Sequence, residues 1–155
     1  MNRRGFTLIE LLAVIVLIGI LGVLIVPNAL NAIDEGKTAS YNTLVKNIVT
    51  SSQMYYEECE YGDLSDSAKY GSYACTINSN TITTTLGTLA NSGFLSVNNT
   101  KVENGKEIRI VIDPINDNDI SSCKVKITKE VSSNYKVTYK IENNDSSTIC
   151  PTAYE

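Results

Sequence analysis

One carboxylate lies where a membrane-spanning chain rarely keeps one. Glu10 is the single charged residue in the apolar run from Phe6 to Val26. Placing an acidic side chain at the centre of a bilayer costs about 2.5–3.5 kcal/mol on insertion scales, so such a residue is a functional candidate that needs a cationic partner. No lysine or arginine occurs between Phe6 and Asn28. A cut after Gly5 would create the missing cation, because Phe6 would then have a free α-amino group.

Phe6 and Glu10 are four residues apart and therefore share one face of a helix. The new amine could pair with Glu10 of its own chain or with Glu10 of a neighbouring chain. Either pairing would lower the free energy of burying the carboxylate. Only the second would also set the register of one subunit against the next.

Four cysteines form a second group, and all of them follow the apolar run: Cys59, Cys75, Cys123 and Cys150. Their spacings contain no short paired motif and the chain has no histidine, which argues against zinc. An even number of cysteines in an exported domain favours disulfides. Pairs 59–75 and 123–150 are favoured because both close local loops, although the sequence leaves the other two pairings open.

A third group consists of carboxylates and amides between residues 113 and 119. Asp113, Asp117 and Asp119 offer oxygens of the kind that calcium prefers, but the spacing is not that of an EF-hand. A solvated turn rich in Pro, Asn and Asp is the favoured interpretation. No phosphate-binding loop, nucleophile motif or histidine is present, so we expect no enzymatic activity and no cofactor.

The apolar run must position Glu10, and its length fits a membrane. It would span roughly 30 Å as a helix, close to the thickness of a hydrocarbon core. Arg3 and Arg4 precede it and favour a cytoplasmic N-terminus, which places the remainder outside. An ordinary secretory signal is shorter and ends at a small-residue cleavage site, for which Val26-Pro27-Asn28 is a poor candidate. A plain signal anchor explains everything except Gly5 and Glu10.

The segment Gly5-Phe6-Thr7-Leu8-Ile9-Glu10 resembles the prepilin processing motif of type IV pilins and type II secretion pseudopilins. The close resemblance covers about the first 35 residues. It implies that residues 1–5 are a leader, cut by a prepilin peptidase after Gly5. Phe6 would become an N-methylated N-terminus, and Glu10 would pair with the Phe6 amine of an adjacent subunit during assembly.

One long helix is expected from about Thr7 to Glu57, with residues 6–27 as its transmembrane and assembly part and 28–58 as an amphipathic continuation. Gly19, Gly22 and Pro27 weaken the first part. The resemblance to pilins implies that this soft spot is helical in the isolated precursor and partly unwound in a filament.

Residues 59–155 are expected to form an extracellular head, in an α+β fold of type IV pilin-like architecture with the long N-terminal helix packed on a small C-terminal antiparallel sheet. The apolar face from Tyr41 onward should contact that sheet. A short helix is expected at 84–91 and strands at 108–112, 124–129 and 135–141, the last two as a hairpin whose alternating lysines face water.

These features predict a structural pilin of a type IV pilus-like filament. Its partners would be further copies of itself, other pilins, the prepilin peptidase and an inner-membrane assembly platform, with the membrane as its location before assembly and the cell surface afterwards. A net charge of −4 argues against general nucleic-acid binding. The alternatives are a pseudopilin of a type II secretion or DNA-uptake system, or a membrane-anchored binding domain that never polymerises and keeps its leader.

Overall fold

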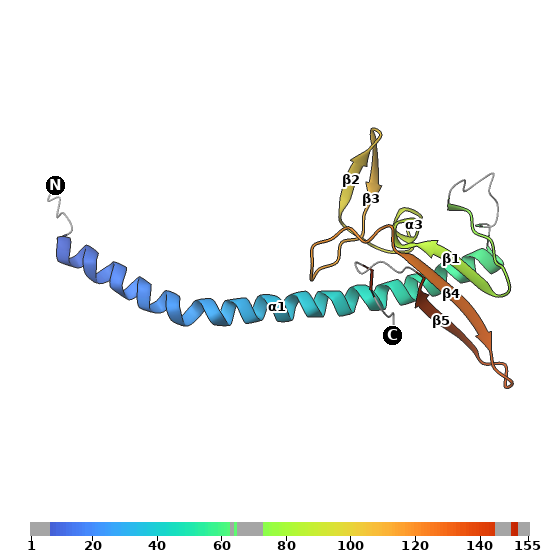
Figure 1. Ribbon diagram of the computed structural model, residues 1–155, viewed down its shortest axis with the longest axis horizontal. Coiled ribbons are helices and arrows are strands. Elements are labelled where there is room, and N and C mark those ends of the chain that lie inside the picture. Colours follow the sequence, from blue (N-terminus) through green and yellow to red (C-terminus); the bar gives the residue numbers. More distant parts are fainter. Residues whose placement is uncertain (1–6, 63, 65–72, 145–149, 152–155) are drawn as a thin grey trace. The chain divides into compact units, whose positions relative to one another are not determined.

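The computed structural model describes residues 7–62, 64, 73–144 and 150–151 (Figure 1). Two compact units divide the chain, residues 1–39 and 40–155, and each is described here by itself. The elements in chain order are α1 (Leu8–Tyr61), β1 (Thr81–Thr85), α3 (Leu86–Asn91), β2 (Thr100–Glu103), β3 (Lys106–Arg109), β4 (Lys124–Val131) and β5 (Val137–Asn143). The fold is α+β, as the sequence predicts.

Helix α1 begins one residue later than expected and continues to Tyr61, four residues beyond the expected end. At Gly62 a Cβ atom would lie 2.7 Å from the carbonyl oxygen of Glu58, so the residue that follows the helix has to be glycine. In the first unit the large apolar side chains of α1 are exposed, for example Leu8 at 83% and Val23 at 75%. Among the described residues α1 is the one helix long and apolar enough to cross a membrane.

The second part of α1 is amphipathic and supplies one wall of the core. Its buried residues, single or in adjacent pairs, recur every three or four positions, as one helical face requires: Val45, Ile48, Ser51, Ser52, Tyr55, Tyr56 and Cys59. This face packs with the sheet and with α3, which confirms the expectation for the region after Tyr41. Ser51 reinforces the contact because its Oγ donates to the carbonyl of Phe94 at 2.9 Å.

The main sheet has three antiparallel strands in the order β1-β4-β5 (Figure 1). Ile82, Ile127 and Ile141 lie directly opposite one another across it. The β4–β5 hairpin is confirmed, and its turn is closed where the N–H of Ser132 donates to the carbonyl of Lys136 at 3.0 Å. The hairpin pairs through β4 with an additional strand, β1, which was not predicted from the sequence.

The expected helix at 84–91 is two residues too long at its start. Thr84 and Thr85 belong to β1, and α3 begins only at Leu86. Thr85 is the N-cap of α3, since its Oγ1 accepts from the N–H of Thr88 at 3.1 Å. Consecutive β-branched threonines favour an extended backbone, and threonine is a preferred N-cap, so both residues obey rules that the helix prediction overlooked.

The expected strand at 108–112 is wrong in extent, and its pairing was not predicted. β3 ends at Arg109 and pairs with β2 in a separate two-stranded sheet. Asn104 and Gly105 connect the two strands, and their φ angles of 51° and 74° are those of the Asn-Gly hairpin turn. Val111 is fully buried, and its N–H donates to Oγ of Ser121 at 2.8 Å rather than to a strand.

Candidate functional site

The N-terminal site is built on the first turn of α1, where Thr7 and Glu10 bind each other reciprocally. Oε2 of Glu10 accepts from the N–H of Thr7 at 2.8 Å and from its Oγ1 at 2.9 Å. In return, Oγ1 of Thr7 accepts from the N–H of Glu10 at 3.3 Å. This arrangement is a capping box, in which two backbone donors left open at a helix start are satisfied.

The capping box gives Glu10 a structural role beside its expected assembly role. Thr7 was missed in the sequence analysis, although Thr7-x-x-Glu10 ahead of an apolar run is the signature of this motif. Both hydrogen bonds that the Glu10 carboxylate accepts use Oε2, which leaves Oε1 without a partner among the described residues. Gly5 and Phe6, the expected processing residues, lie outside the described residues.

The expected soft spot lies within α1. Gly19, Gly22 and Pro27 are all part of one continuous helix in the isolated chain. A Cβ atom at Gly19 or Gly22 would meet no atom within 4 Å. Neither glycine is therefore needed for a close contact inside the described chain, and their effect is to lower helix propensity by up to about 1 kcal/mol each relative to alanine.

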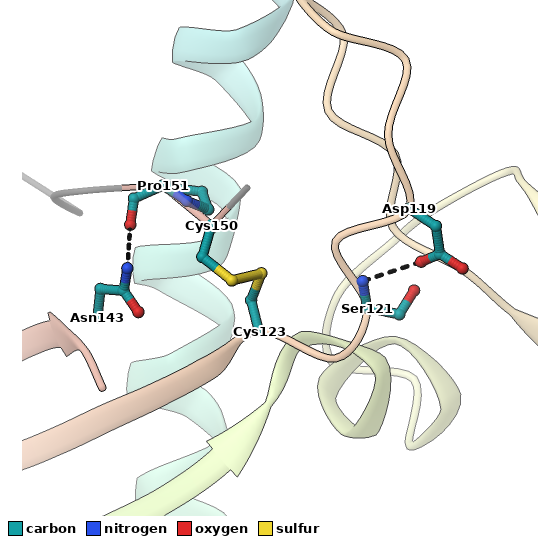
Figure 2. The surroundings of a disulfide bond; sticks show 6 residues. All are labelled: Asp119, Ser121, Cys123, Asn143, Cys150 and Pro151. Atoms are coloured by element: carbon teal, nitrogen blue, oxygen red, sulfur yellow. Dashed lines mark hydrogen bonds between the residues drawn. A yellow bond between two sulfur atoms is a disulfide. The ribbon is translucent and has the colours of Figure 1, made fainter. Parts of the chain in front are cut away.

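The four cysteines form two disulfides in the second unit. Cys59 pairs with Cys75 and Cys123 with Cys150, with Cα–Cα distances of 6.0 and 5.6 Å. These are the two local pairs that the sequence favoured. Figure 2 shows that the second bridge fastens the segment at 150–151 beside the start of β4, and Nδ2 of Asn143 donates to the carbonyl of Pro151 at 2.6 Å nearby.

The acidic segment at 113–119 uses its carboxylates to shape the loop. Asp113 is 5% exposed, and it accepts from the N–H of Ile115 at 2.9 Å and from Nδ2 of Asn116 at 2.8 Å. Asp119 accepts from the N–H of Ser121 at 2.9 Å (Figure 2) and from Nζ of Lys101 at 3.2 Å. In the part of the chain that the structure describes, no three His, Cys, Asp or Glu residues converge as metal ligands.

One lysine of the sheet does not face water as expected. Lys129 is only 11% exposed, and its Nζ donates to both carboxylate oxygens of Glu60, at 2.8 and 2.6 Å, and to Oη of Tyr61 at 3.1 Å. The hydrogen bonds to Glu60 are the main reason that the pKa of Lys129 is raised. Because the last turn of α1 has no basic residue of its own, Lys129 supplies the positive charge that a helix C-terminus favours.

Comparison with known proteins adds one match, over the N-terminal segment. Residues 1–26 match the family model described as the prokaryotic N-terminal methylation motif. This motif is the hallmark of the precursors of type IV pilins and pseudopilins, which confirms the resemblance drawn from Gly5 to Glu10. No curated protein and no solved structure matches the chain.

Proposed function

We propose that this chain is the precursor of a structural subunit of a type IV pilus-like extracellular filament. A prepilin peptidase cuts it after Gly5, Phe6 becomes the N-methylated N-terminus, and the subunit then polymerises through its N-terminal helix. Before assembly the apolar part of α1 holds it in the cytoplasmic membrane, with the leader in the cytoplasm and the head outside.

The observation that supports this proposal most is the position of Glu10 inside the matched segment. A cut after Gly5 leaves the Phe6–Thr7 peptide bond intact, so the N–H of Thr7 remains a donor and the capping box survives processing. The new Phe6 amine arises beside a carboxylate whose Oε1 has no partner among the described residues. In the filament that oxygen accepts from the Phe6 amine of an adjacent subunit, and the ion pair offsets the burial of Glu10.

The exposed apolar part of α1 supports the second half of the proposal. A helix with uncovered Leu, Ile and Val side chains on all faces needs lipid or other helices around it. Lipid covers this surface in the precursor, and neighbouring copies of α1 cover it in the filament. The segment from Gly19 to Pro27 unwinds in part as it packs. Other pilins and an inner-membrane assembly platform are the remaining partners.

The proposal is tested by producing the full chain together with a prepilin peptidase and an assembly platform, and by examining sheared filaments. The chain should be recovered in filaments, whereas Glu10→Ala should be cut normally and be depleted from them. A filament map should show interrupted helix between Gly19 and Pro27. A chain that is cut but never leaves the membrane in the presence of the machinery would overturn the proposal, and an unbroken helix in the map would remove the unwinding step.

A further inference from the structure

Strand β1 lies at the edge of the three-stranded sheet, and among the described strands β4 alone pairs with it (Figure 1). The hydrogen bonds at the two ends of the β1–β4 ladder show which residues of β1 bond to β4. The carbonyl of Asn80 accepts from the N–H of Lys129, and the N–H of Leu86 donates to the carbonyl of Cys123. Antiparallel pairing alternates, so the even-numbered residues of β1 bond to β4. The backbone groups of Thr81, Thr83 and Thr85 therefore point to the open side.

Part of that open side is already used. The N–H and the carbonyl of Thr81 both bond to Asn78, at 2.9 and 3.0 Å. Thr85 is the N-cap of α3, so its carbonyl faces the first turn of that helix. Three groups are left: the N–H and carbonyl of Thr83 and the N–H of Thr85. No described residue bonds to them, although an unsatisfied backbone group is unfavourable wherever water is excluded.

A cleft of about 490 Å³ follows this free edge. One wall is β1 and the other is the segment from Ala74 to Asn78, beside the bridged Cys75. The described residues of the lining include no charged side chain and are rich in hydroxyl groups: Tyr55, Thr76, Thr81, Thr83, Thr84, Thr85 and Thr88. Exposed strand edges are usually protected by lysine, proline or a bulge, and the sequence of β1, TITTT, has none of the protecting residues.

We propose that this cleft is a strand-acceptor site, which binds an extended, uncharged segment of another polypeptide. The free groups along the edge are a donor and an acceptor at Thr83 and a donor at Thr85, a pattern that another backbone complements when it adds as a strand. Threonine hydroxyls on both sides favour small polar or β-branched side chains on the incoming segment. This inference is independent of filament assembly and concerns the head alone.

The incoming strand comes from a different protein rather than from a second copy. Every other described strand of this chain contains charged residues, as in TKVE, KEIR, KVKITKEV and VTYKIEN. Inserting such a charge between uncharged walls would leave it desolvated without a partner. An uncharged segment avoids that penalty. β1 of a second copy is uncharged too, but its open side is flanked by its own residues 74–78 and is partly bonded to Asn78, so it does not fit into the cleft as a free strand.

The test uses the full chain in detergent micelles, labelled for amide NMR, and a blocked peptide of alternating threonine and valine. The peptide should shift the amide resonances of Thr83 and Thr85 and slow their hydrogen exchange. A control peptide N-methylated at every residue has no backbone donors and should not bind. Absence of any shift along β1 at millimolar peptide, or equal binding of the methylated peptide, would overturn the proposal.

A pair of variants keeps the test specific. Thr83→Pro removes the outward N–H but no bond to β4, so the sheet should persist while peptide affinity falls about tenfold. Thr83→Val keeps the N–H and should bind as the unchanged chain does. The amides of Ile82 and Thr84 report whether β1 stays paired. Equal affinity of Thr83→Pro with an intact sheet would refute the site, and concentration-dependent shifts without peptide would assign the edge to a second copy instead.

Discussion

Oε2 of Glu10 accepts from the N–H of Thr7 at 2.8 Å and from its Oγ1 at 2.9 Å. These two hydrogen bonds give the Glu10 carboxylate a role that does not depend on a cation. A glutamate at the third position of a helix is useful for capping alone, so its presence in the apolar run does not by itself demand a cation. The separation of the capping role from the charge-pairing role therefore becomes the main question about this residue.

Glu10→Gln separates the two roles because glutamine can complete a capping box but cannot form an ion pair. We expect Glu10→Gln to keep the start of α1 ordered and to fail in filament incorporation, as is expected for Glu10→Ala. Amide hydrogen exchange at residues 8–11 in micelles reports the cap, and the subunit content of sheared filaments reports assembly. Normal incorporation of Glu10→Gln would assign Glu10 to capping alone.

Thr7 provides the complementary change. Thr7→Val removes the Oγ1 bonds and should weaken the first turn by about 1 kcal/mol, which hydrogen exchange of the same amides measures. Thr7→Ser retains the hydroxyl and serves as the matched control. Exchange rates in Thr7→Val equal to those in Thr7→Ser would show that the hydroxyl contributes nothing.

Lys129 should stabilise the head more than the other paired lysines of the sheet. Lys129→Met removes its bonds to Glu60 and Tyr61, whereas Lys140→Met removes a pair with Glu142 in which the lysine side chain is 59% exposed. We expect a clearly lower melting temperature for Lys129→Met and little change for Lys140→Met. Equal melting temperatures of the two variants would contradict this ranking.

The same pair defines a pH dependence. The pKa of Lys129 is raised in the folded state. Its contribution to the free energy of unfolding is therefore complete below the unfolded lysine pKa of about 10.4, and it is lost as the pH rises through the higher pKa of the folded state. The difference in melting temperature between the unchanged chain and Lys129→Met should therefore be constant across neutral pH and shrink only in strongly alkaline solution. A difference that shrinks near pH 7 would contradict the assignment.

The two disulfides should stabilise the head by similar amounts. In the chain-entropy model the loop closed by Cys123–Cys150 contributes about 3.5 kcal/mol and that closed by Cys59–Cys75 about 3 kcal/mol, for sequence separations of 27 and 16. Replacing both cysteines of one pair by serine should lower the free energy of unfolding in urea by these amounts. Loss of less than 1 kcal/mol for either pair would show that its loop stays closed without the bridge.

Tyr135 occupies a backbone position that glycine would fill better. Its φ is 61° and its side chain is 90% exposed at the tip of the β4–β5 hairpin. Because a left-handed backbone costs a non-glycine residue about 1–2 kcal/mol, Tyr135→Gly should raise the free energy of unfolding by about 1 kcal/mol. Tyr135→Ala has a Cβ and should show no such gain, so an equal gain in both variants would exclude backbone strain as the cause.

The spacing of apolar residues predicted much of the fold. The amphipathic face of α1 and the β4–β5 hairpin follow from regular periods of apolar residues, which tertiary packing reinforces. The expected placement of Val111 in a strand failed because its side chain is buried in the hydrophobic core from a loop, while its N–H donates to the Ser121 side chain. β1 was missed because Ile82 is its one apolar residue, so its alternation is too weak to detect.

Other features were present in the sequence and were overlooked. Asn104-Gly105 is a strong hairpin signal, yet its flanking strands are exposed and charged and so lack the apolar alternation of a core strand. Thr7-x-x-Glu10 specifies a capping box, but a lone carboxylate in an apolar run also indicates a charge-pairing role, and only the second was predicted. The partner of Lys129 could not be predicted, since it depends on where α1 ends relative to β4.

The central claim is that Gly5 is the last residue of a leader, and intact mass spectrometry of the N-terminus tests it most directly. The full chain is produced with and without a prepilin peptidase. The account predicts Met1 at the N-terminus without the enzyme and N-methylated Phe6 with it, and Gly5→Leu should remain uncut. An intact leader on the unchanged chain in the presence of active peptidase would contradict the account.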